Sequence, residues 1–154
     1  MLLSELLNAQ AVNPRLGATT KGEVIVELVE LLESAHGVQS HGEILDRVLK
    51  REAMMSTGIG NGVAIPHGKA KAVDRLIAAC GVSPDGVEFE AVDGAAAHLF
   101  ILLVSPESVG APHVKVLANI SRLSKEDSVR QRLRSAASAA DFLTALHDAE
   151  KKYL

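Results

Sequence analysis

The sequence predicts a single α/β domain, with helices at both ends of the chain and strands in the middle. One-sided apolar patterns that follow capping residues indicate helices before residue 55 and after residue 111. Two continuous apolar runs between them, 76–82 and 98–104, indicate buried strands. A chain of 154 residues, 47% hydrophobic but only 3% aromatic, is long enough for one substantial aliphatic core. No internal repeat, low-complexity segment or linker interrupts residues 1–154, so we expect one domain.

The N-terminal part is predicted to be helical. Residues 2–7 form a short apolar lead, expected to make one helical turn. Thr20–Glu23 matches a capping box, in which the hydroxyl accepts a hydrogen bond from a free helix amide and the glutamate reaches back. The helix that follows should stop at Gly37. Ser40–Glu43 repeats the capping-box pattern and predicts a second helix that ends near Arg51 and packs on the first as a hairpin.

The middle of the chain is predicted to form the sheet. Leu76–Val82 is expected to be a buried strand, and the turn-forming residues of 83–86 should follow it as a turn. The alternating residues 87–89 suggest an edge strand, with a second turn at 93–94. His98–Val104 is the longest apolar run and is expected to be the central strand, because it is apolar on both faces.

Three further helices are expected in the C-terminal part. Pro112 and His113 should open the first of them. Ser128 is expected to cap a short basic helix over 129–134. Ser138, followed three residues later by Asp141, resembles a capping pattern and predicts the last helix.

A glycine-rich stretch, 56–68, carries a single histidine at its end. Val63–Ile65 is expected to be a short buried strand, which Pro66 ends because proline cannot donate to a sheet ladder. His67 therefore lies at a strand end, where it can serve as a nucleophile, a base or a ligand. A structural turn with an incidental histidine remains the alternative.

Composition excludes several classes of function. A formal net charge of −3 argues against nucleic acid as a partner. The single cysteine, Cys80, cannot form an intrachain disulfide, which fits a reducing compartment. Because neither a signal-peptide pattern nor a membrane-length apolar run is present, we expect a cytoplasmic protein without membrane insertion.

Common catalytic motifs are also missing. The six histidines show no i, i+4 pair typical of a zinc enzyme, so we expect no metal site. There is no Gly-x-Ser-x-Gly elbow, and Cys80 is expected to be buried and inert. Gly62 is followed by valine and alanine, where a nucleotide phosphate loop needs lysine and a hydroxyl residue.

His67 itself remains as the candidate reacting group, and reversible phosphoryl carriage suits it. A neutral imidazole can attack phosphorus and leave again, and cationic donors should surround the phosphoryl oxygens. Arg51 ends a helix just before the glycine-rich stretch, and His113 starts a helix just after the central strand. Taken alone, Arg51 could be a solvated helix-end cation and His113 a residue that only bonds the backbone.

The segment from Thr57 to Gly68, Thr-Gly-Ile-Gly-Asn-Gly-Val-Ala-Ile-Pro-His-Gly, resembles the phosphorylation-site signature of the IIA domains of the bacterial phosphotransferase system, fructose/mannitol type. This type includes the nitrogen-related regulatory IIA proteins. The resemblance extends to Lys21, to Arg51–Glu52 and to the Leu-Leu-Val-Ser-Pro end of the central strand. Arg51 stands 16 residues before His67 and His113 stands 46 residues after it, as in the family.

The resemblance implies a mixed β-sheet flanked by helices, with His67 taking a phosphoryl group on Nε2 from HPr or its nitrogen-branch counterpart. Arg51 and His113 would hold the phosphoryl group, and no metal or nucleotide cofactor is needed. The apolar and glycine residues around His67 would form the docking surface for the donor. Gly58, Gly60 and Gly62 would let their loop lie flat, while Ser56, Thr57 and Asn61 could form hydrogen bonds near the histidine or merely cap turns.

Three functions stay open. The first is a free-standing regulatory phosphocarrier that binds target proteins; we favour it because the chain ends at Leu154 without a linker, a IIB domain or a membrane segment. The second is the IIA component of a fructose or mannitol uptake system, which passes phosphate to a cysteine of a IIB domain. The third is a binding protein that has lost the chemistry.

Overall fold

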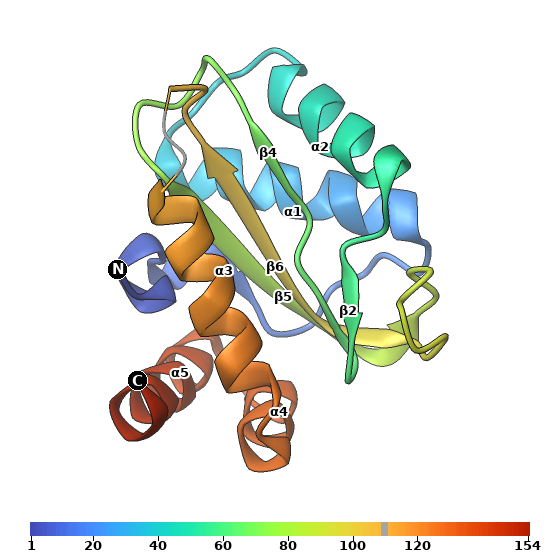
Figure 1. Ribbon diagram of the computed structural model, residues 1–154, viewed down its shortest axis with the longest axis vertical. Coiled ribbons are helices and arrows are strands. Elements are labelled where there is room, and N and C mark those ends of the chain that lie inside the picture. Colours follow the sequence, from blue (N-terminus) through green and yellow to red (C-terminus); the bar gives the residue numbers. More distant parts are fainter. Residues whose placement is uncertain (109–110) are drawn as a thin grey trace.

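A mixed β-sheet forms the centre of the molecule (Figure 1). Within residues 1–108 and 111–154, which the computed structural model describes, six strands pair in the order β1-β5-β6-β3-β2, and β4 also pairs with β6. Long β5 and β6 are antiparallel, whereas β3 and β4 run parallel to β6. The strands are β1 (Val12–Asn13), β2 (Gly58–Gly60), β3 (Val63–Ala64), β4 (His67–Lys69), β5 (Ile77–Val87) and β6 (Ala97–Ser105).

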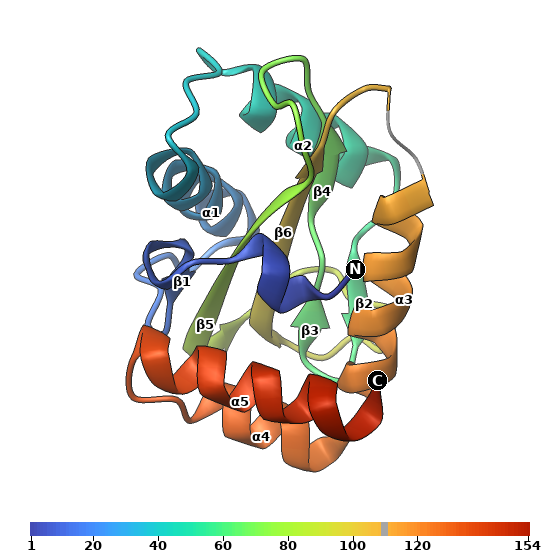
Figure 2. The ribbon, with the colours of Figure 1, turned by 90° about the vertical axis from the view of Figure 1, so that its left-hand side faces the viewer.

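Helices cover both faces of the sheet (Figures 1 and 2). One face packs on a helical pair, and the other packs on three helices that follow the last strand and on the N-terminal segment. The pair is α1 (Lys21–His36) and α2 (Glu43–Met54); the others are α3 (Ala111–Ser124), α4 (Asp127–Arg134) and α5 (Ala139–Tyr153), after two 3-10 turns (Leu3–Leu6 and Ala9–Ala11). This single α/β domain with a mixed sheet confirms the predicted fold class.

β6 is central because both of its faces are apolar. Alternate residues Leu99, Ile101 and Leu103 belong to the core beneath α3, α4 and α5, while Phe100, Leu102 and Val104 belong to the core beneath α1 and α2. A strand buried on both faces reads as a continuous apolar run, which is why the sequence predicts its position correctly.

Two of the predicted helix starts are confirmed. The Thr20 hydroxyl accepts a hydrogen bond from the Glu23 amide at 3.3 Å, and the Ser138 side chain accepts one from the Asp141 amide at 3.1 Å. The Glu23 carboxylate accepts from the Thr20 hydroxyl at 2.8 Å, however, and not from a backbone amide. Gly37 ends α1 in the left-handed conformation, with φ 65°.

The other two predicted caps are wrong. Gly42, with φ 90°, is the residue that precedes α2, although the Ser40 hydroxyl accepts a hydrogen bond from the Ile44 amide at 3.2 Å. Glu43 points away from the helix start because its carboxylate accepts hydrogen bonds from the amides of Lys71 and Ala72. Ser128 lies inside α4, which begins at Asp127.

The predicted turn at 83–86 is also wrong. These residues lie within β5, where the register against β6 shifts between Val82 and Val87. Pro84 and Gly86, with φ 83°, suit this irregularity because a bulge tolerates both a missing donor and a positive φ. Val87 ends β5, so the predicted edge strand at 87–89 does not form, and the turn at 93–94 is confirmed.

Candidate functional site

His67 is fixed by main-chain contacts at the first residue of β4. His67 thus lies at a strand end, as predicted, but it begins β4 and pairs with Leu103 of β6, whereas the strand expected to precede it, β3, ends at Ala64 and not at Ile65. Its Nδ1 lies 2.8 Å from the Ile65 carbonyl oxygen. Because a carbonyl only accepts hydrogen bonds, Nδ1 carries the proton and Nε2 presents a lone pair.

The half-buried imidazole of His67 is neutral at pH 7. Burial lowers its pKa below the usual range; the hydrogen bond to Ile65 opposes this shift, the Arg51 charge adds to it, and the Glu52 charge opposes it. A neutral ring with a free Nε2 is the nucleophilic form of histidine.

His113 lies against His67, near the start of α3. The two ring centroids are 5.1 Å apart and the rings meet edge to face at 70°. His113 is only 7% exposed, and its Nδ1 is 3.3 Å from the Oγ of Ser105, the last residue of β6. Its buried Nε2 has no hydrogen-bond partner among the described residues. Burial lowers the pKa of His113 to about 4, with smaller effects from His67 and Lys69.

Arg51 is half-buried on the last turn of α2. Its Nη1 donates a hydrogen bond to the Met55 carbonyl at 3.0 Å, and its charge acts on His67. The structure thus brings Arg51, His67 and His113 into one site. β4 packs closely on α2 here: a Cβ added to Gly68 would lie 3.2 Å from the backbone nitrogen of Val48, which is tighter than nine in ten such contacts in proteins.

The polar residues of the glycine-rich stretch make structural contacts instead of reaching His67. The Ser56 hydroxyl donates to the Phe89 carbonyl at 2.7 Å, and the Thr57 hydroxyl to the Glu52 carboxylate at 2.6 Å. The Asn61 amide donates to Asp93 Oδ2 at 3.0 Å. These contacts match the alternative prediction for the three residues, namely that they cap turns and do not bond the histidine.

The glycines of this stretch shape a strand and a tight turn. Gly58 and Gly60 belong to β2, which pairs antiparallel with β3, so this part is a strand and not the expected loop. A Cβ on Gly58 would lie 2.9 Å from the Ala91 Cα. Gly60 and Gly62 flank Asn61, and all three have positive φ, with values of 92°, 76° and 56°.

Sequence reasoning gave no role in the site to three residues that lie there, Lys21, Glu52 and Ser105. Glu52 is 6% exposed and binds both Thr57 and Lys21, and Ser105 touches His113. Lys21 and Glu52 lie within the family resemblance, but no local pattern indicates their contact, which joins residues 31 positions apart. Ser105 ends the central strand, and its proximity to His113 depends on the path of the chain into α3.

The remaining histidines are separate from this site. His36 and His98 each bond a main-chain carbonyl, of Ala78 and Ser83 respectively. His41 and His147 are exposed. No group of three or more histidine, cysteine or carboxylate side chains in the described part of the chain is arranged to hold a metal ion. Burial raises the pKa of the Cys80 thiol, in line with its predicted inertness.

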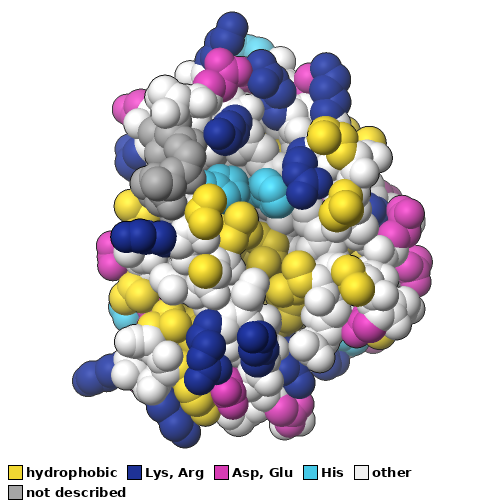
Figure 3. Space-filling model, viewed as in Figure 1, with side chains coloured by type: hydrophobic (Ala, Val, Ile, Leu, Met, Phe, Trp, Pro, Cys, Tyr) yellow, Lys and Arg dark blue, Asp and Glu magenta, His cyan; other side chains and the backbone are white. Residues whose placement is uncertain are grey.

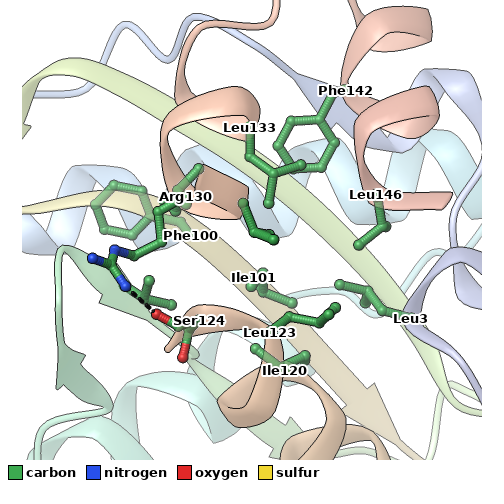
Figure 4. A pocket seen from close by; sticks show the side chains of 13 residues that line it. Leu3, Phe100, Ile101, Ile120, Leu123, Ser124, Arg130, Leu133, Phe142 and Leu146 are labelled. Carbon is green, nitrogen blue, oxygen red and sulfur yellow. Dashed lines mark hydrogen bonds between the residues drawn. The ribbon is translucent and has the colours of Figure 1, made fainter. Parts of the chain in front are cut away.

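An apolar cavity of about 30 Å³ lies away from the histidines, between the sheet and α3, α4 and α5 (Figure 4). Its lining includes Phe100, Ile120, Leu133 and Phe142; Arg130 lies at its edge and donates a hydrogen bond to the Ser124 carbonyl at 2.6 Å. That volume is far below the roughly 300 Å³ or more of a small-molecule site, so the cavity is a gap in the core packing.

Exposed apolar side chains lie close to the site in the chain. Met54 and Met55 follow Arg51 and are 81% and 70% exposed, and Val114 follows His113 and is 65% exposed. Figure 3 shows two adjacent histidine side chains on one face of the molecule, with basic side chains beside them and a band of hydrophobic side chains below. None of the described helices is long and apolar enough to cross a membrane.

Known proteins share this sequence pattern and fold. The family described as "Phosphoenolpyruvate-dependent sugar phosphotransferase system, EIIA 2" matches residues 5–149. The chain is 32% identical over 151 residues to the fructose-specific EIIABC component of Bacillus subtilis, covering 98% of this chain and 24% of that protein. It therefore spans about a quarter of that relative. It is 31% identical to a nitrogen regulatory protein of Bradyrhizobium diazoefficiens, over 95% of each chain.

Solved structures agree with these matches. The nitrogen regulatory protein IIA-Ntr from Neisseria meningitidis superimposes with a TM-score of 0.86 at 29% identity, over 93% of this chain and 97% of that one. The mannitol enzyme IIA of Escherichia coli, in its complex with phosphorylated enzyme IIB, superimposes with a TM-score of 0.77 at 26% identity, over 92% and 97%.

Proposed function

This chain belongs to the EIIA 2 family of the phosphoenolpyruvate-dependent sugar phosphotransferase system, and from that premise we propose that it is a phosphocarrier whose His67 accepts a phosphoryl group. The donor is the phosphohistidine of a small carrier protein, HPr or its nitrogen-branch counterpart. One observation carries the proposal: the Ile65 carbonyl holds the Nδ1 proton of His67, which leaves Nε2 free as a nucleophile beside His113.

The transfer exchanges one phosphorus–nitrogen bond for another. The Nε2 lone pair of His67 attacks phosphorus while the bond to the donor imidazole breaks, and its electron pair returns to the donor nitrogen. His67 keeps its Nδ1 proton, so its ring gains positive charge as the new bond forms. The Ile65 carbonyl, 2.8 Å from Nδ1, stabilises that charge.

Two groups from other elements stabilise the phosphoryl oxygens. His113, with a pKa of about 4, is neutral at pH 7. When the Ser105 hydroxyl donates to its Nδ1, its proton sits on the buried Nε2, which then donates to a phosphoryl oxygen. The Arg51 guanidinium supplies positive charge from the end of α2.

The donor docks on the apolar rim of the site. Met54 and Met55 follow Arg51 in the chain, Val114 follows His113, and Ile59 belongs to the glycine-rich stretch; all four are at least 40% exposed, and exposed apolar side chains suit a protein partner. The interface must be weak and short-lived, because the two proteins separate after each transfer.

For the next step we favour the regulatory, nitrogen-related branch, in which the phosphorylation state controls binding to target proteins. The match over 95% of a nitrogen regulatory protein and the TM-score of 0.86 to IIA-Ntr support this choice. The alternative is transfer to a cysteine of a IIB domain during sugar uptake. A fructose-specific relative at 32% identity and the fold of mannitol enzyme IIA favour that alternative.

The test is an intact-mass measurement. The protein is incubated with phosphoenolpyruvate, enzyme I and HPr, or with the nitrogen-branch pair, and kept mildly alkaline. We expect one acid-labile phosphoryl group on the wild type and none on His67→Ala. The more efficient donor pair identifies the branch. Phosphorylation of folded His67→Ala would move the site elsewhere, and no phosphorylation by either pair would favour a binding protein with a relic site.

A further inference from the structure

The carboxylate of Glu52 fastens the chain that connects α2 to the glycine-rich stretch. It is 6% exposed and accepts two hydrogen bonds from Thr57, from the amide at 2.9 Å and from the hydroxyl at 2.6 Å. Lys21, the first residue of α1, brings its Nζ to 2.9 Å from the same carboxylate and lies over the Phe89 ring. Figure 1 shows the C-terminal end of α2 beside the N-terminal end of α1, so three segments meet here.

Arg51 depends on the same connection for its position. Its guanidinium donates to the carbonyl of Met55, which lies two residues before Thr57. Arg51 and Glu52 are neighbours on the last turn of α2, and each binds the segment just beyond the helix. The contact that fixes Thr57 therefore lies within two residues of the carbonyl that holds the guanidinium.

The connection also extends to His67. The Thr57 carbonyl accepts a hydrogen bond from the Ile65 amide at 3.0 Å, and the Ile65 carbonyl accepts the Nδ1 proton of His67 at 2.8 Å. A continuous set of hydrogen bonds therefore runs from Glu52 through Thr57 and Ile65 to the imidazole.

We propose that Glu52, held by Lys21 and bound to Thr57, is a positioning residue that fixes the Arg51 guanidinium relative to the His67 ring. This inference rests on the proposed function for its consequence, the rate of phosphoryl transfer, but the geometry it describes can be measured without transfer. A charge-assisted hydrogen bond to a buried carboxylate is strong and directional enough for this task. Glu52 itself touches no reacting atom.

The test uses the titration of His67, followed by NMR of its ring. The charges that act on this ring are those of Arg51 and Glu52, and the His113 ring, which also titrates, lies 5.1 Å from it. Thr57→Val removes the hydroxyl bond to Glu52 but keeps the amide bond and every charge. We expect this to loosen the hold on the Arg51 guanidinium and to raise the pKa of His67. With Arg51→Ala already present, Thr57→Val causes no further rise. Thr57→Ser keeps the hydroxyl and restores the wild-type pKa.

A matched control separates positioning from general loss of stability. Ser138→Ala removes one capping bond at the start of α5, away from the site, and should leave the pKa of His67 unchanged. If Thr57→Val does not fold, Lys21→Gln replaces it, because Lys21 is not among the charges that act on His67. An unchanged pKa in the folded variant, or an equal rise without Arg51, would overturn the proposal.

Transfer kinetics give the second readout. We expect Thr57→Val to lower kcat/KM for phosphoryl acceptance on the order of tenfold, the effect of losing one charge-assisted contact. The loss should be absent in the Arg51→Ala background. If the wild type accepts no phosphoryl group, the proposed function is wrong. The NMR titration would still show whether Glu52 positions Arg51.

Discussion

Replacing His113 tests the site most directly, because its Nε2 is buried beside His67 and lacks a partner among the described residues. We expect His113→Ala to slow phosphoryl acceptance. A hydrogen bond to a charged oxygen contributes about 1.5–3 kcal/mol, which corresponds to a fall in kcat/KM of roughly 10- to 150-fold. His113 is 7% exposed, so its truncation also lowers the free energy of unfolding by about 1–3 kcal/mol.

Two replacements separate the donor from the volume of the side chain. The glutamine amide nitrogen can reach the position of Nε2, whereas that of asparagine reaches only the position of Nδ1, next to Ser105. His113→Gln should therefore recover most of the rate and His113→Asn should not. The assay is transfer from a phosphorylated donor, timed by rapid quench, with thermal unfolding of each variant as the measure of folding.

The exposed His41 provides the control, since it lies outside the site. His41→Ala should leave the rate unchanged. If His113→Ala folds and transfers as fast as His41→Ala, His113 is only a packing residue. If glutamine and asparagine give equal rates, the assignment of the donor to Nε2 is wrong.

Two further predictions concern Arg51 and Gly58. The Arg51 charge lowers the pKa of His67, so Arg51→Ala should raise that pKa and move the acid limb of the pH–rate profile to higher pH, besides slowing transfer about tenfold; a limb that does not move would separate Arg51 from His67. Gly58→Ala places a Cβ 2.9 Å from Ala91 Cα and should cost about 1–3 kcal/mol of stability in denaturant unfolding, whereas Gly22→Ala, which meets nothing within 4 Å, should not destabilise the protein.

The sequence predicts elements well where the signal is local. Thr20, Gly37 and Ser138 mark the ends of their helices as expected, because a cap involves only residues within one turn. The Ser40–Glu43 pattern fails because of a non-local contact: the Glu43 carboxylate, expected to reach back to the helix start, binds the amides of Lys71 and Ala72 instead. The Ser40 hydroxyl still accepts from the Ile44 amide, but Gly42 precedes the helix.

Pairing across the sheet accounts for the remaining differences. Residues 83–86 have turn chemistry, yet they continue β5 because flanking residues on both sides pair with β6. Contacts between residues far apart in the sequence also decide the arrangement of the site, and the sequence alone does not reveal them. Spacing within the chain and family resemblance indicate Arg51, His67 and His113, but the contacts of Glu52 with Lys21 and of His113 with Ser105 require the fold.

The close packing of β4 on α2 bears on how the proposed phosphorylation of His67 would be recognised by a partner. At Gly68 the backbone of β4, which begins with His67, lies close to the backbone of Val48 in α2, which also carries Arg51. We therefore expect these two elements to keep their relative positions when His67 carries a phosphoryl group. On the proposed function, a partner would recognise the negative phosphoryl oxygens on the His67 ring, a local change of charge on a surface whose backbone stays the same. Partners that distinguish the two states need a complementary basic or acidic group at that place, and the backbones of both states should superimpose.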